Sequence, residues 1–227
     1  MRGVAADKIL VPLCGKPVVV YSLEAFIESE VADHFVFVYR DEAQKGILKS
    51  IVEKRVSGSI KTFWVQGGEE RQDSVYHALQ TLSPSAQHVF IHDCARPLVV
   101  PAALRSLLDI VREDRAVCLA HPVKDSIKEL ASEPDASLRK LTLQNIERDL
   151  LWAMETPQVF DRELITASYR KLIEKNARVT DDTAAVAANN HPVSLLENHA
   201  PNPKLTSPED FLYLEFLIKR QSSKEKR

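Results

Sequence analysis

Short apolar runs alternate with amphipathic segments along this chain. The runs at 34–39, 60–65, 88–91 and 116–120 are rich in β-branched and aromatic residues, as is typical of buried strands. The segments 19–28, 41–55, 72–82 and 101–113 carry apolar residues at helical spacing. This alternation predicts an α/β fold, in which a mostly parallel, Rossmann-like sheet has helices on both faces.

The alternation breaks between residues 122 and 150. Polar and apolar residues alternate at 123–130 and again at 138–143, and Glu133-Pro134-Asp135 between them is a turn sequence. We interpret 123–148 as a β-hairpin arm projecting from a single domain that spans 1–227. Because one domain could not bury such an arm, we expect two chains to exchange arms in a homodimer.

Beyond the arm, helical patterns resume at 162–175, 181–189 and 208–219. The stretch 151–160 contains Thr156-Pro157-Gln158 and is interpreted as a rigid turn. That turn is either structural, with Trp152 in the core, or functional.

Charge and cysteine content limit the possible functions. The chain has 30 Lys and Arg against 32 Asp and Glu, so no overall basic field favours nucleic acid, and anionic ligands would need local clusters. It lacks an apolar run of about 18 residues, and we expect neither a membrane span nor a signal peptide. Its three cysteines lack CxxC spacing, which favours a reducing compartment, the cytoplasm, over a disulfide framework or a zinc site.

The most informative stretch is His92-Asp93-Cys94-Ala95-Arg96-Pro97, directly after the run 88–91. Ligands of open α/β sheets bind at the carboxyl ends of the strands. Asp93 could hold a ribose hydroxyl or a metal ion there, and Arg96 could clamp a phosphate. The alternative is that Asp93 caps the next helix and Arg96 is its surface partner.

Other clusters also allow two interpretations. Gly67-Gly68-Glu69 follows the run 60–65 and could admit a flat ligand, or it could simply precede a helix. Thr180-Asp181-Asp182 is typical of a helix cap, and Lys204 of a solvated side chain.

Taken in order, these motifs resemble one family along essentially the whole chain. The resemblance lies in Lys8 with Gly15-Lys16-Pro17-Val18, Gly67-Gly68-x-x-Arg71-x-x-Ser74, His92-Asp93-x-Ala95-Arg96-Pro97, Asp125-Ser126-x-Lys128, Thr156-Pro157-Gln158-x-Phe160, Thr180-Asp181-Asp182 and Lys204-x-Thr206-x-Pro208-Glu209-Asp210. The family is 2-C-methyl-D-erythritol 4-phosphate cytidylyltransferase of non-mevalonate isoprenoid synthesis. The resemblance implies transfer of CMP from CTP to methylerythritol phosphate, with Mg²⁺ bound mainly through the CTP phosphates.

Roles follow from the resemblance, residue by residue. It implies that three cations, Lys8, Arg148 and Lys204, act on the triphosphate. Gly68, Glu69 and Ser74 would read cytosine, and Asp93 would hold the nucleotide ribose and acceptor hydroxyls. The remaining substrate contacts would be Arg96, Ser126, Thr156 and Thr180, together with Arg148 and Lys204. Arg148 lies on the arm, which in the family completes the partner's site.

The resemblance departs at the start of the chain. The family opens with a strand and Pro-Ala-Ala-Gly-x-Gly-x-Arg-Met, and Met1 aligns with that methionine. We therefore expect the first strand, the glycine-rich loop and its arginine to be absent from this chain, through a misassigned translation start or a truncation. The alternatives are a sister enzyme acting on ribitol 5-phosphate or a related polyol phosphate, and a non-catalytic nucleotide-binding homologue.

Overall fold

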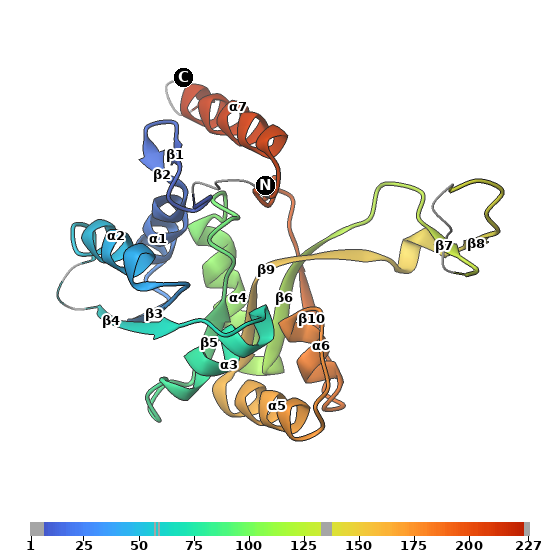
Figure 1. Cartoon of the computed structure of the whole chain (residues 1–227), viewed down its shortest axis with the longest axis horizontal. Helices are drawn as coiled ribbons and strands as arrows, with labels where there is room; N and C mark the ends of the chain where they lie inside the picture. Colours follow the sequence, from blue (N-terminus) through green and yellow to red (C-terminus); the bar gives the residue numbers. More distant parts are fainter. Residues whose placement is uncertain (1–6, 57, 59, 133–137, 225–227) are drawn as a thin grey trace.

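A central sheet of mixed strand direction organises the protein (Figure 1). The computed structural model describes residues 7–56, 58, 60–132 and 138–224. The sheet contains β10 (Ser194–Glu197), β6 (Ala116–Pro122), β9 (Trp152–Asp161) and β5 (His88–Ile91), in that order. β10 is parallel to β6, whereas β9 is antiparallel to both β6 and β5. The predicted α/β class is confirmed, but the central strand reverses the parallel direction.

Two further strands, β3 (His34–Tyr39) and β4 (Lys61–Gln66), form a separate parallel pair beside β5. In the part of the chain that the structure describes, β3 pairs only with β4, and β5 only with β9. Phe26 joins the two sheets, because its ring meets Phe35 of β3 edge-on at 6.3 Å and Phe90 of β5 at 5.8 Å. The strands therefore share one helix layer, although their ladders are separate.

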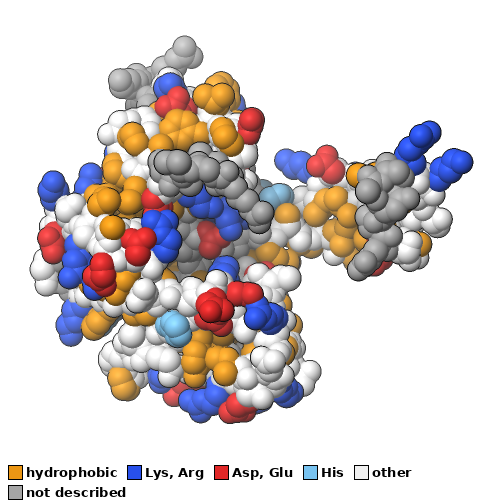
Figure 2. Space-filling view, in the orientation of Figure 1, with side chains coloured by type: hydrophobic (Ala, Val, Ile, Leu, Met, Phe, Trp, Pro, Cys, Tyr) orange, Lys and Arg blue, Asp and Glu red, His pale blue; other side chains and the backbone are white. Residues whose placement is uncertain are grey.

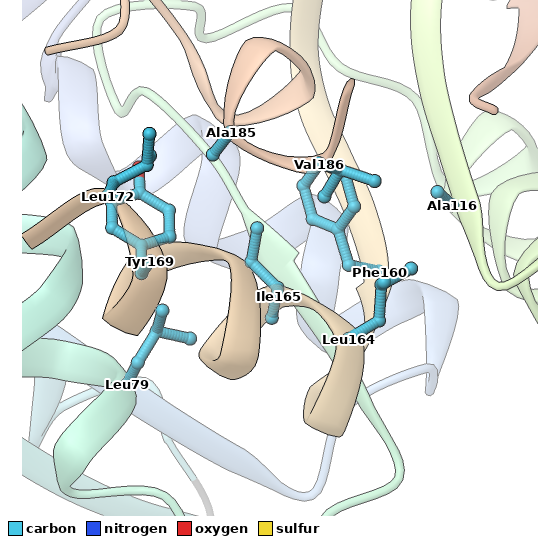
Figure 3. Packing of buried hydrophobic residues seen from close by; sticks show 9 residues of the cluster. All are labelled: Leu79, Ala116, Phe160, Leu164, Ile165, Tyr169, Leu172, Ala185 and Val186. Atoms are coloured by element: carbon cyan, nitrogen blue, oxygen red, sulfur yellow. The ribbon is translucent and has the colours of Figure 1, made fainter. Parts of the chain in front are cut away.

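Helices cover both faces of the central sheet, as expected. α1 (Val18–Ser29) and α4 (Pro101–Asp114) pack on one face, where Leu107 contacts Val159 of β9. On the other face, α5 (Arg162–Glu174) and α6 (Asp182–Ala187) enclose Phe160, with Leu79 of α3 (Arg71–Gln80) beside them (Figure 3). Val159 and Phe160 are both fully buried, on opposite faces, because successive side chains of a strand alternate.

The remaining helices, α2 (Glu42–Val52) and α7 (Pro208–Lys224), flank the body. No helix among the described residues is long and apolar enough to cross a membrane. The short hairpin of β1 (Pro12–Leu13) and β2 (Lys16–Pro17) and the strand β10 were not predicted.

The interpretation of 151–160 as a turn was wrong, because β9 is a ten-residue strand. Pro157 cannot donate to a ladder, and a central strand accommodates proline only at an irregularity. The β6–β9 pairing is irregular at this point: its register shifts between Cys118 and Ala120, and residues 155–157 stay outside the ladder.

The predicted arm is present. β7 (Lys128–Leu130) pairs antiparallel with β8 (Leu143–Asn145), and the short helix η1 (Arg148–Leu150) leads back to β9. Figures 1 and 2 show this segment projecting from the body as a separate lobe. The predicted turn at 133–135 lies outside the described residues. Leu143 and Leu150 on this lobe are 55% and 78% exposed.

Candidate functional site

Charged side chains from four distant segments meet where β5 ends. Asp93 follows β5, and its Oδ2 accepts a hydrogen bond of 2.5 Å from Lys204 Nζ, on the loop between β10 and α7. Arg71, the first residue of α3, places its Nε 3.6 Å from Asp93 Oδ1. The other end of Arg71 pairs with Asp182 of α6. Charged side chains thus gather at the carboxyl end of β5, where Asp93 is expected from the sequence.

Asp93 is ionised at this position. Burial raises the pKa of Asp93, but the hydrogen bond and charge of Lys204, together with Arg71, lower it below its ordinary value. The interpretation of Asp93 as a helix cap is wrong, because α4 begins at Pro101 without any side-chain cap. Its carboxylate faces two cations instead.

Hydrogen bonds that involve Thr156 and His92 fix the loop that carries Asp93. Asp93 N donates to Thr156 Oγ1 at 3.1 Å, and the same oxygen lies 3.1 Å from His92 Nδ1. His92 Nε2 is hydrogen-bonded to Ser22 Oγ at 3.1 Å. Burial lowers the pKa of His92 to about 4, so this ring is neutral near pH 7. Thr156 is itself buried, and in this structure its hydroxyl holds the Asp93 loop in place.

A second support holds the loop that carries Lys204. Arg96 Nη1 donates to the carbonyl of Asn202 at 2.7 Å, and Leu205 N donates to the carbonyl of Ala95 at 2.7 Å. Asn202 Nδ2 donates in turn to Glu155 Oε2 at 2.8 Å. Glu155 is only 4% exposed, and sequence reasoning missed it. Because Glu155 is followed by Thr156-Pro157-Gln158 in the sequence, nothing local marked it as buried.

The glycine turn after β4 is closely packed. Gly68 N donates to Ser74 Oγ at 3.1 Å. A Cβ on Gly68 would lie 2.3 Å from Asp73 Cβ, and one on Gly67 would lie 2.8 Å from Ser74 Oγ. The segment precedes a helix, as one of the two interpretations has it: Glu70 and Asp73 form a capping box at the start of α3. The glycines are needed because α3 residues occupy the space that a Cβ would take, and Glu69 beside them is exposed.

The Thr180-Asp181-Asp182 segment has two functions. Asp181 caps α6, as predicted, since its Oδ1 accepts from Ala184 N at 2.8 Å. Asp182, in contrast, is fully buried and accepts hydrogen bonds from Arg71 and from the Tyr169 hydroxyl. Thr180 is exposed just ahead of the helix.

Gln158 connects this segment to β9. Its Oε1 accepts from Asp182 N at 3.0 Å and from Thr183 N at 3.1 Å, while its Nε2 donates to Asp181. The Thr-Pro-Gln and Thr-Asp-Asp motifs therefore form one connected unit.

Three predicted residues come from other segments of the chain. Lys8 is exposed in the turn before β1, which Asp7 ties to Gln44 of α2. Ser126 and Arg148 line a surface pocket on the arm, where Arg148 Nη1 donates to the carbonyl of Lys124 at 3.2 Å. Because the arm projects away from the body, a single chain does not bring these two residues to Asp93 (Figure 1).

Comparison with known proteins accounts for this arrangement of motifs. Residues 2–220 match the family model described as IspD, 2-C-methyl-D-erythritol 4-phosphate cytidylyltransferase. The chain belongs to this cytidylyltransferase family. The enzyme of that name from Caldanaerobacter subterraneus is 34% identical over 220 residues, covering 94% of this chain and 91% of the relative. Its namesake from Synechococcus elongatus is 31% identical, covering 96% and 91%.

Solved structures agree with the family assignment. The 4-diphosphocytidyl-2C-methyl-D-erythritol synthase of Anaerococcus prevotii superposes with a TM-score of 0.82 at 25% identity, covering 95% of this chain and 94% of that one. The Thermus thermophilus cytidylyltransferase, at 23% identity and a TM-score of 0.75, shares the fold. The arrangement of layers is therefore that of the cytidylyltransferases.

Proposed function

We propose that this protein transfers CMP from CTP to 2-C-methyl-D-erythritol 4-phosphate and releases pyrophosphate. The single observation that carries the proposal is the contact between Asp93 and Lys204 at the carboxyl end of β5, in a chain that matches this family over residues 2–220. The carboxylate suits hydroxyl groups of sugars, and the ammonium suits phosphate. Both substrates carry both kinds of group.

The proposed reaction requires no covalent intermediate on the protein. A phosphate oxygen of the acceptor attacks the α-phosphorus of CTP in line, the bond to the β-phosphate breaks, and pyrophosphate leaves. Because the attacking phosphate is already ionised, no general base is needed, and positioning with charge stabilisation dominates. We assign the charge stabilisation to Lys204 and Lys8 of one chain and to Arg148.

For the nucleotide, we assign base recognition to Gly68, Glu69 and Ser74. Glu69 is exposed beside the glycines, where a base could approach it. Polar groups matched to one base edge are left unpaired by another base. CTP is therefore expected to raise the melting temperature more than UTP or ATP does, and equal shifts would contradict this assignment.

Mg²⁺ is expected to arrive with the nucleotide. Within the described ranges, no group of three or more His, Cys, Asp or Glu side chains could hold a metal ion. Asp93, the acid nearest to the proposed phosphate site, already faces Arg71 and Lys204. We therefore assign the metal to the CTP phosphates, where it would neutralise charge during transfer.

We further propose a homodimer in which each arm completes the partner's site with Ser126 and Arg148. The exposed Leu143 and Leu150 support this proposal. An arm in water leaves these apolar side chains unburied, whereas a partner chain would bury them. Light scattering at micromolar concentration is expected to give twice the chain mass. A monomer would contradict the proposal.

The test of the proposed activity is product identification. With CTP, Mg²⁺ and methylerythritol phosphate, mass spectrometry is expected to find the CDP-linked methylerythritol together with pyrophosphate. Lys204→Ala is expected to lower the rate by at least tenfold. Unchanged activity in that variant would contradict the role assigned to Lys204. The cytoplasmic location rests on the free cysteines and remains a prediction.

A further inference from the structure

We infer that Arg71 is a positioning residue that fixes the Asp93 carboxylate relative to the start of α6, and that it acts on the reaction only through Asp93. The inference rests on the proposed function, because it concerns how Asp93 is presented to CTP. The resemblance assigned no role to Arg71.

The outer end of the Arg71 guanidinium is firmly anchored. Its Nη1 donates to Asp182 Oδ1 at 3.0 Å and its Nη2 to Oδ2 at 2.5 Å, a bidentate pair. Asp182 cannot shift easily, because it is fully buried and Tyr169 donates to its Oδ1 at 2.6 Å. Gln158 also accepts from the Asp182 backbone N–H. The guanidinium is therefore held by α5, α6 and β9 together.

The inner end of the same guanidinium meets Asp93. Arg71 Nε lies 3.6 Å from Oδ1, whereas Lys204 bonds the other oxygen, Oδ2. The two cations thus face different oxygens of the carboxylate, Lys204 at hydrogen-bonding distance and Arg71 at ion-pair distance. When the Lys204 ammonium turns to a phosphate of CTP, Arg71 still faces Oδ1, so that Asp93 stays ionised and aimed at the substrate hydroxyls.

Lysine cannot reproduce this geometry. A guanidinium presents donors in a rigid, planar fork, so one group can bond Asp182 with its two outer nitrogens and face Asp93 with the third. An ammonium is a point charge on a flexible stem and would remain with the buried Asp182. Arg71→Lys should therefore keep the buried pair and release Asp93.

A purely structural role for Arg71 makes a different prediction. If it served only to neutralise Asp182, then an uncharged pair of similar shape would replace it without loss of activity. Replacing a buried ion pair by neutral groups is often harmless to stability, whereas removing one member alone is costly. The double variant Arg71→Gln/Asp182→Asn therefore separates folding from positioning.

The experiment measures kcat and KM for CTP in wild type, Arg71→Lys and Arg71→Gln/Asp182→Asn, with melting temperatures for each. We expect KM for CTP to rise about tenfold in both variants while kcat stays within threefold. A loss of folded enzyme would instead lower kcat at constant KM. The matched control is Arg115→Gln, whose guanidinium pairs with Asp161 at 2.9 Å away from the site and whose kinetics should equal those of wild type.

A double-mutant cycle then tests whether Arg71 acts through Asp93. In an Asp93→Asn background, Arg71→Lys should change the CTP dissociation constant by less than twofold, because the carboxylate that it positions is gone. Independent, multiplicative effects of the two changes would overturn the inference, as would wild-type KM in Arg71→Lys. CTP binding measured by calorimetry reports this coupling between Arg71 and Asp93, and it does not require turnover. A wild-type chain that binds CTP but makes no product would therefore contradict the proposed function and leave the test of Arg71 intact.

Discussion

Replacing Gly68 by alanine should damage the nucleotide turn by a clash that can be located in the structure. The added Cβ would lie 2.3 Å from Asp73 Cβ. Carbon atoms in contact normally stay about 3.5–4.0 Å apart, so the turn or the first residues of α3 must move by more than about 1 Å.

Such a movement breaks two hydrogen bonds. Glu70 N donates to Asp73 Oδ2 at 3.1 Å in the capping box, and Gly68 N donates to Ser74 Oγ at 3.1 Å. A lost cap costs about 0.5–2 kcal/mol and a lost hydrogen bond about 1 kcal/mol. The free energy of unfolding should therefore fall by about 1–3 kcal/mol, which lowers Tm by about 3–10 °C in a protein of this size.

Thermal unfolding measures the loss of stability, and calorimetric CTP binding measures the loss of affinity. CTP affinity should fall at least tenfold, because Gly68 and Ser74 are displaced. The control is Gly46→Ala in α2, where the added Cβ meets nothing within 4 Å, so this variant should gain about 0.5–1 kcal/mol from helix propensity and bind CTP normally. A Gly68→Ala variant with wild-type Tm and affinity would refute the reasoning.

Three further predictions concern buried groups. Burial lowers the pKa of His92 from 6.5 to about 4, so the stability that depends on its neutral ring is complete above about pH 6.5 and is lost as pH falls towards 4. Between pH 7.5 and 5, the free energy of unfolding in urea should fall by about 2 kcal/mol more in wild type than in His92→Gln, and equal losses would contradict this. Gln158→Leu removes the acceptor of two N–H groups at the start of α6 and should lower the free energy of unfolding by about 2–4 kcal/mol. An unchanged urea midpoint would show that these hydrogen bonds do not stabilise the fold. Burial raises the pKa of the half-buried Cys94 to about 11 and that of the buried Cys118 to about 12, so a thiol reagent at pH 8 should label exposed Cys14 first. Peptide mapping that found Cys94 or Cys118 labelled first would contradict this order of reactivity.

The sequence predicted those parts of the fold that depend on local periodicity. The strands at 34–39 and 88–91 were predicted with the observed bounds, and the helix at 101–113 ends one residue later in the structure. Hydrophobic spacing records which side of an element is buried, and that information is local. The arm was predicted for the same reason.

β9 could not be predicted in this way, because three of its six buried positions are polar. Glu155, Thr156 and Gln158 are each at most 5% exposed, and a buried polar side chain is tolerated only where it has partners. Those partners come from remote segments: Asn202 for Glu155, and Asp181 for Gln158. In the sequence the segment therefore resembles a polar turn.

The site shows the same limit. Asp93 was predicted from its position after a strand, but its partner Lys204 lies 111 residues further on, and from the residues alone that lysine is typical of a solvated side chain. The family resemblance identified both residues without predicting their contact. The pairing of Arg71 with Asp182, also 111 residues apart, was missed, because an acid beside a helix cap gives no sign of burial.

Acceptor-dependent release of pyrophosphate tests the central claim most directly. The chain is incubated with CTP and Mg²⁺, and release is compared without acceptor, with methylerythritol phosphate and with ribitol 5-phosphate. The proposed function predicts release above background with methylerythritol phosphate only, and at least a tenfold loss in Asp93→Asn. Release that prefers ribitol 5-phosphate, or none with any acceptor from a chain that binds CTP, would contradict it.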